Sequence, residues 1–134
     1  MIQLIILLLF SAFSVADNCD ISPLTTECIK QMPRKFRSLK SFSLPKRKEG
    51  FIEYSYVLTK GTRYHVGACF NAVDNLKIEV FSSKRLLVAT ITSKKKYSKL
   101  TYKCASSGIY YMRFSCNSSD NSCGAGLLSF ASKD

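Results

Sequence analysis

The sequence predicts an all-β protein, an antiparallel β-sandwich of about seven or eight strands with a short N-terminal helix. From Phe51 onward, apolar and polar residues alternate with a period of two in one segment after another. Runs of Gly, Ser, Asn and Lys separate these segments, which recur roughly every eight to twelve residues. Alternation of this kind indicates strands with one buried and one solvated face, as in antiparallel sandwiches.

A short helix and one strand are expected before this region. Ser22 followed by Pro23 is a helix start signal, because proline suits the first helical turn. Pro33 ends the helical pattern. The apolar stripe of the helix consists of Leu24, Cys28, Ile29 and Met32. The basic segment "RKFRSLKSFSLPKRKEG" then contains the first predicted strand and a loop.

The remaining strands are predicted from alternation and from the turns between them. They lie in "IEYSYVL", "TRYHVGACF", "LKIEVF", "LLVATIT", "KLTYKC", "GIYYMRFSC" and "CGAGLLSF". The segment "GIYYMRFSC" alternates most regularly, with Tyr110, Met112, Phe114 and Cys116 on one side. We expect this side to pack across the core against the like faces of "IEYSYVL" and "LKIEVF".

The chain begins with a predicted secretory signal peptide at residues 1–16. An apolar run is followed by small residues, with Ser14 and Ala16 next to the expected cleavage site. A lipoprotein signal is the alternative, but Asp17 and Asn18 stand before Cys19 where a small residue would be required. The prediction is a secreted or periplasmic protein. Residues 17–50 would form the helix, basic segment and first strand, and residues 51–134 the sandwich.

Six cysteines lie in the mature chain, and an even number in a small exported protein favours disulfide bonds. They are Cys19, Cys28, Cys69, Cys104, Cys116 and Cys123. Metal binding is the alternative, but the chain has no C-x-x-C pair and a single histidine. The pairing stays open, with a preference for a Cys116–Cys123 bond that would close the loop "NSSDNS".

The formal net charge is +11, from 20 Lys and Arg residues against nine Asp and Glu. Two clusters with interleaved aromatic residues are candidates for binding a polyanion such as an acidic polysaccharide or a lipid headgroup surface. Nucleic acid is disfavoured, since no recognised binding module is present. The alternative is that these residues maintain solubility and block strand-edge pairing. The candidates are Lys30, Arg34, Lys35, Arg37, Lys40, Lys46, Arg47, Lys48, Lys94, Lys95, Lys96, Lys99 and Lys103.

No catalytic residues are predicted. The single histidine, His65, shares a strand face with Arg63 and Cys69, opposite the expected core, and is predicted to be a surface or partly hydrogen-bonded residue. No acid lies near it in sequence to orient it as a general base. A nucleophilic Cys69–His65 pair would require a free thiol. The carboxylates are scattered among turns, termini and solvated strand faces, and no pair stands out.

The succession "YSYVLTKGTRYHV", "DNLKIEVFSSKRLLVAT" and "KLTYKCASSGIYYMRFS" resembles the bacterial pre-peptidase C-terminal domain over roughly residues 51 to 131. This resemblance implies a jelly-roll-like sandwich that serves as a binding or accessory unit of secreted enzymes. Here no catalytic domain accompanies it. Some relatives bind calcium, and Asn71, Asp74 and Asn75 occupy the corresponding loop. One carboxylate is few for a cation that takes about 6–8 oxygens, so an Asx-rich turn is favoured over a calcium site and no cofactor is predicted.

Three functions follow from these observations. The first is a secreted, non-catalytic binding module for an anionic glycan, a cell surface or a protein. The second is a structural or interaction protein of the cell envelope, whose charge serves solubility alone. The third and most remote is a small hydrolase.

Overall fold

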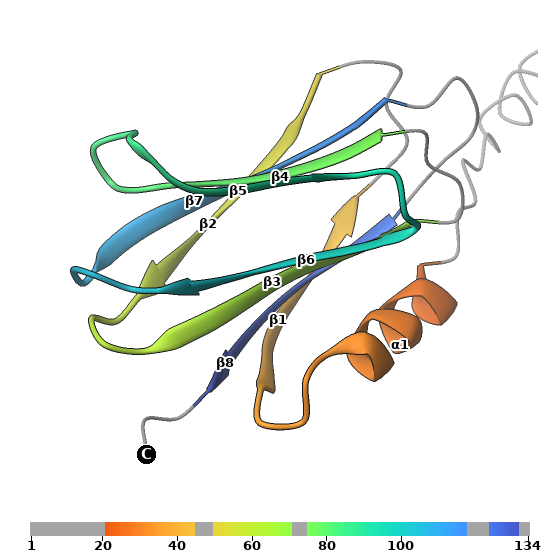
Figure 1. Ribbon diagram of the computed structural model, residues 1–134, viewed down its shortest axis with the longest axis horizontal. Coiled ribbons are helices and arrows are strands. Elements are labelled where there is room, and N and C mark those ends of the chain that lie inside the picture. Colours follow the sequence, from red (N-terminus) through yellow and green to blue (C-terminus); the bar gives the residue numbers. More distant parts are fainter. Residues whose placement is uncertain (1–20, 45–49, 71–74, 118–123, 132–134) are drawn as a thin grey trace, which may run out of the picture.

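Residues 21–44, 50–70, 75–117 and 124–131 are described by the computed structural model of the chain (Figure 1). These residues form a helix and eight strands. In chain order the elements are α1 (Ser22–Gln31), β1 (Arg37–Leu44), β2 (Ile52–Leu58), β3 (Arg63–Phe70), β4 (Asn75–Phe81), β5 (Leu87–Ser93), β6 (Tyr97–Lys103), β7 (Gly108–Asn117) and β8 (Gly124–Ala131).

The strands form two four-stranded antiparallel sheets that face each other. Sheet A has the order β1-β8-β3-β6, and sheet B has the order β2-β7-β4-β5. Consecutive strands change sheet at every connection except that between β4 and β5 (Figure 1). This is the strand order of a double-sheet jelly roll. The predicted fold class, strand number and jelly-roll-like architecture are therefore confirmed.

The N-terminal elements agree with the sequence pattern. Helix α1 begins at Ser22 with Pro23 in its first turn, as the start signal predicts. Lys30 lies in the last turn, where its charge interacts favourably with the partial negative charge of the helix end. Strand β1, from the basic segment, pairs with β8 at one edge of sheet A.

The interior between the sheets consists of the inward-facing residues that alternation predicts. On β4, Leu76, Ile78 and Val80 are buried, while the side chains between them point outward. The turn between β2 and β3 contains Gly61 at φ +87°, a left-handed conformation that glycine adopts without steric cost. The alternation of apolar and polar residues thus places the core residues on the inner faces of the described strands.

The predicted packing partners of β7 are wrong. Strands β2 and β4, which contain "IEYSYVL" and "LKIEVF", flank β7 within sheet B instead of facing it across the core. The inner face of β7 packs against sheet A, where the rings of Phe114 and Phe42 lie 6.3 Å apart. A Cβ at Gly126 of β8 would lie 3.2 Å from the Phe114 ring. Alternation specifies which side of a strand is buried, but it carries no information about which strand lies beside it.

The predicted signal peptide, residues 1–16, and the basic loop residues Lys46, Arg47 and Lys48 lie outside the described residues. Within the ranges that the structure describes, no helix has the length and apolar character needed to cross a membrane.

Replacing Phe114 by Ala is expected to lower the free energy of unfolding by about 3–5 kcal/mol, because this side chain is buried between the sheets. The matched control is Ile109→Ala on the same strand, where the side chain is 47% exposed and the change should stay within about 0.5 kcal/mol. Urea unfolding monitored by circular dichroism measures both. Equal effects of the two substitutions would contradict the assignment of the inner face of β7.

Candidate binding surface

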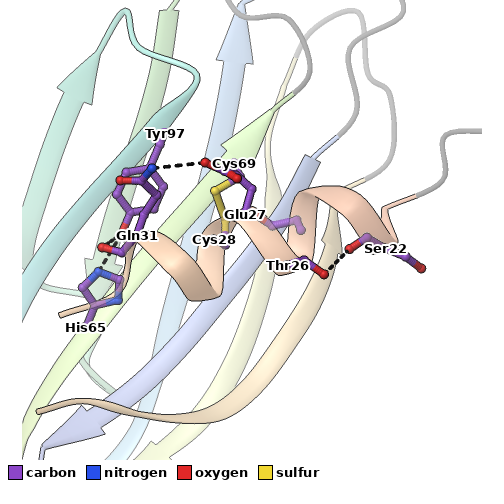
Figure 2. Close-up of a disulfide and its surroundings, with 9 residues drawn as sticks. Ser22, Thr26, Glu27, Cys28, Gln31, His65, Cys69 and Tyr97 are labelled. Atoms are coloured by element: carbon purple, nitrogen blue, oxygen red, sulfur yellow. Dashed lines mark hydrogen bonds between the residues drawn. A yellow bond between two sulfur atoms is a disulfide. The ribbon is translucent and has the colours of Figure 1, made fainter. Parts of the chain in front are cut away.

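Helix α1 lies on the outer face of sheet A, against β8 and β3 (Figure 1). A disulfide bond joins Cys28 of the helix to Cys69 of β3, with a Cα–Cα distance of 5.7 Å (Figure 2). Both cysteines are buried together with Leu127 of β8. Cys28 and the partly buried Leu24 and Met32 therefore cover a sheet face that would otherwise meet water, whereas Ile29 of the predicted stripe is 44% exposed.

The prediction for the histidine beneath the helix holds in part. A surface position is wrong, because the His65 side chain is fully buried, but a partly hydrogen-bonded ring is correct, since Nε2 has a partner and Nδ1 has none among the described residues. The strand parity was right, since His65 points away from the core between the sheets, yet α1 and the following turn cover this outer face. The ring of Phe36, from that turn, lies 5.6 Å from the imidazole. A Cβ at Gly67 would lie 2.9 Å from Cε1 of His65, so the glycine leaves room for the ring.

A hydrogen-bonded chain connects His65 to the end of the helix (Figure 2). Nε2 of His65 lies 2.9 Å from the hydroxyl oxygen of Tyr97 on β6. The Tyr97 hydroxyl in turn donates to the backbone carbonyl of Gln31, at 3.4 Å. Because the hydroxyl proton is used toward Gln31, Nε2 carries the imidazole proton and donates to Tyr97. One otherwise unpaired carbonyl at the helix end is thereby satisfied.

Burial keeps both side chains neutral near pH 7. Loss of hydration and, to a smaller extent, the nearby positive charge of Lys99 together lower the pKa of His65 to about 4. Burial also raises the pKa of Tyr97 to about 12. A nucleophilic Cys69–His65 pair does not form, because Cys69 is in the disulfide.

Six cationic side chains lie along β6, on the turn before it and at the start of β3, and we call them the β6 basic surface. Arg63 of β3 stands directly opposite Lys103 of β6 in the strand register, and both are exposed. Lys99 lies on the same outward face of β6, opposite Gly67. The members of the surface are Arg63, Lys94, Lys95, Lys96, Lys99 and Lys103. Arg63 was missing from the predicted set, since only the register places it beside Lys103.

The described residues of the first predicted basic cluster lie in two places. Arg37 and Lys40 lie on β1, which is at the opposite edge of sheet A from β6. Arg34 and Lys35 are exposed in the turn that places Phe36 over His65. Arg37 and Lys40 are therefore separated from β6 by the width of sheet A, whereas Arg34 and Lys35 lie beside the residue that covers β3. Lys30 precedes Gln31, whose carbonyl contacts Tyr97 of β6.

The ion pairs that the structure describes lie on the outer face of sheet B. Glu53 accepts hydrogen bonds from Arg85 at 2.8 Å and from Arg113 at 3.2 Å, and Lys77 lies 3.6 Å from Glu79. Burial alone would raise the pKa of Glu53, but the hydrogen bonds and charges of the two arginines outweigh it, and the pKa lies below its usual value. Among the described residues, no ion pair involves a member of the β6 basic surface.

The remaining cysteine and metal predictions have mixed outcomes. Cys104 is buried and unpaired, which corrects the expectation that every cysteine forms a disulfide; its thiol donates to the carbonyl of Ser106 at 3.1 Å. The side chains of Cys19, Cys116 and Cys123 lie outside the described residues, as do Asn71 and Asp74 of the calcium loop. Within the described ranges, no three His, Cys, Asp or Glu side chains gather as a metal site would require.

No protein-family model matches the chain, and comparison with curated protein sequences also finds no match. The resemblance to the pre-peptidase C-terminal domain is therefore not confirmed as a family assignment, although the implied jelly-roll-like sandwich is the observed fold.

Several solved structures are similar to this chain at low identity. One is PliG, a periplasmic lysozyme inhibitor of g-type lysozyme from Aeromonas hydrophila, with 13% identity and a TM-score of 0.48 over 71% of this chain and 85% of that chain. Others are the CBM36-1 domain of a multidomain xylanase from the hindgut metagenome of Trinervitermes trinervoides (11% identity, TM-score 0.43, 69% of this chain and 77% of that chain) and a CBM4 structure (8%, 0.39, 62% and 61%). At these values the similarity identifies neither a family nor a ligand.

The free energy of unfolding is expected to decrease as the pH falls from 6.5 toward 4. In this window the unfolded chain binds a proton on histidine, whose usual pKa is 6.5, while the buried His65 stays neutral until about pH 4. Urea unfolding at several pH values measures the slope, and His65→Gln should flatten it between pH 6.5 and 5, above the carboxylate range. Because the chain has a single histidine, its NMR signal is unambiguous, and titration near pH 6.5 would contradict the buried position.

The double variant Cys28→Ser/Cys69→Ser is expected to lose about 4 kcal/mol of stability, because the bond closes a loop with a sequence separation of 41 residues. The pKa of His65 should also rise toward its usual value as the helix loosens. Thr26→Ala, on the exposed side of α1, is the control and should change stability by less than about 0.5 kcal/mol. An unchanged histidine titration in the double variant would contradict the role of the bond in holding α1 on the sheet.

Proposed function

We propose that the mature protein is an exported, non-catalytic binding module that holds a polyanion, such as an acidic or sulfated polysaccharide, on the β6 basic surface. The observation that carries this proposal is the cross-strand pair of Arg63 and Lys103, which places two cations directly opposite each other on the outer face of sheet A. Like charges in this arrangement destabilise a sheet. An anionic ligand would relieve the repulsion.

The geometry of β6 suits a chain with repeated negative groups. Lys99 and Lys103 point to the same side of the strand, and a rise of about 3.4 Å per residue places their Cα atoms roughly 13 Å apart. Thr101 lies between them on the same face and is exposed, so it offers a hydroxyl to the same ligand. The lysines at positions 94 to 96 extend the row at the start of the strand.

Two further observations support export and a role in binding. Disulfide bonds such as Cys28–Cys69 persist in oxidising compartments, including the periplasm and the extracellular space. His65 is neutral and buried beneath α1, so it supports the fold and is not available to an external substrate.

A second function has an observation in its favour. Lys40 of β1 and Lys99 and Lys103 of β6 lie on edge strands, where lysine blocks pairing with other chains. On this alternative the protein is a structural or interaction protein of the envelope, and its charges prevent aggregation without holding a ligand. The two functions predict different behaviour toward polyanions. A binding site requires lysines at particular positions, whereas charges that serve only to prevent aggregation would attract a polyanion according to net charge alone.

Immobilised heparin is the probe for this distinction. The unmodified protein should bind at low salt and elute at moderate salt, because each neutralised anion releases counterions. Lys99→Gln/Lys103→Gln should weaken binding at low salt by about tenfold. The control Lys77→Gln/Lys84→Gln removes the same charge from sheet B and its β4–β5 turn and should have little effect.

Two results would contradict the polyanion proposal. Absence of salt-sensitive binding by the unmodified protein would favour the structural role. Equal weakening by both double variants would show that net charge alone is measured and that the β6 basic surface is not a site.

A further inference from the structure

Strand β5 is an edge of sheet B that differs from the other edges. It pairs with β4 on one side, and no described strand pairs with it on the other. The edge strands β1, β2 and β6 each contain a charged residue, whereas β5, with the sequence LVATITS, contains none. An edge strand presents alternate backbone N–H and C=O groups to solvent, and charge is one common protection against a second chain. This protection is missing within β5.

The side chains of β5 also favour contact with another strand. Leu86, Leu87 and Val88, which follow one another at the start of the strand, are 63%, 50% and 37% exposed, respectively. A register shift opposite Val80 makes Val88 a bulge, after which Ala89–Ser93 continues as a regular edge. Threonine and isoleucine dominate this regular part, and both favour extended backbone.

The charges at the two ends of β5 decide what kind of chain fits there. Lys84 lies in the turn before the strand, and Lys94, Lys95 and Lys96 follow it. If two copies paired antiparallel through β5, these lysines would meet the Lys84–Arg85 turn of the partner copy. Parallel pairing would place the lysine run against itself. Both arrangements oppose like charges, so the edge is poorly suited to self-association.

We propose that β5 binds an extended segment of another protein, which adds a strand to sheet B and carries β-branched residues in its centre and acidic residues at both ends. Backbone hydrogen bonds along Ala89–Ser93 would provide the affinity, and the flanking lysines would select the acidic ends. This proposal shares Lys94, Lys95 and Lys96 with the polyanion proposal. It also needs the β5 backbone and Lys84, whereas polyanion binding also needs Arg63, Lys99 and Lys103.

A synthetic peptide, Asp-Asp-Val-Thr-Ile-Thr-Val-Asp-Asp, is the probe, with binding measured by fluorescence anisotropy. Two further versions carry backbone N-methyl groups, either on the odd or on the even residues of the peptide. An added strand uses the N–H groups of one of its own edges, so one version should lose binding and the other should retain it.

Protein variants test the role of the flanking charges. Replacing Lys84, Lys94, Lys95 and Lys96 together by Gln should weaken peptide binding by about tenfold, because four exposed ion pairs with the peptide would be lost. Lys99→Gln/Lys103→Gln, which is expected to impair heparin binding, should leave peptide binding unchanged. The two proposals can therefore fail independently.

Three results would overturn the strand-addition proposal. The first is absence of peptide binding at millimolar concentration. The second is an equal effect of the two N-methyl patterns, which would indicate simple charge attraction. The third is a dimer in sedimentation analysis that dissociates when Thr90→Lys is introduced into β5, which would assign the edge to a second copy of this chain.

Discussion

A sheet of a two-layered sandwich usually keeps one face in water, yet the outer face of sheet A is covered by α1, and the Cys28–Cys69 bond fastens the helix there. This attachment determines which side chains on the outer face of sheet A are buried and which remain in solvent. Under the helix, His65 becomes an interior residue with a neutral ring, and the Tyr97 hydroxyl joins it to the helix end. Beside the helix, Arg63, Lys99 and Lys103 remain exposed on β3 and β6.

Much of the fold could be predicted because strand formation and face selection are local properties. The alternation of Leu76, Ile78 and Val80 correctly predicts the buried face of β4, and the Ser22–Pro23 signal correctly predicts the start of α1. Strand pairing is not local. The position of β7 between β2 and β4 depends on the path of the connections, so its neighbours could not be read from its own residues.

The candidate site was predictable only as a set of residues without an arrangement. The alternation along β3 places His65 on the correct side of the strand, but its burial depends on a helix that a disulfide bond holds there. The Cys28–Cys69 bond is one of many possible cysteine pairings, so the sequence alone could not predict it. The same holds for Arg63 and Lys103, which are far apart in the chain and become neighbours through the register of β3 and β6. Charge counting finds the lysines but cannot show which are neutralised, as Lys77 is by Glu79.

The charges on the outer face of sheet B differ from those on β6 in how far they are balanced. Glu53 and Glu79 lie on this face, held by arginine and lysine, while the β6 basic surface carries unbalanced positive charge. This uneven distribution gives the described part of the chain an electric dipole. The field of an anionic surface would exert a torque on this dipole during diffusion and would turn β6 toward the surface before contact.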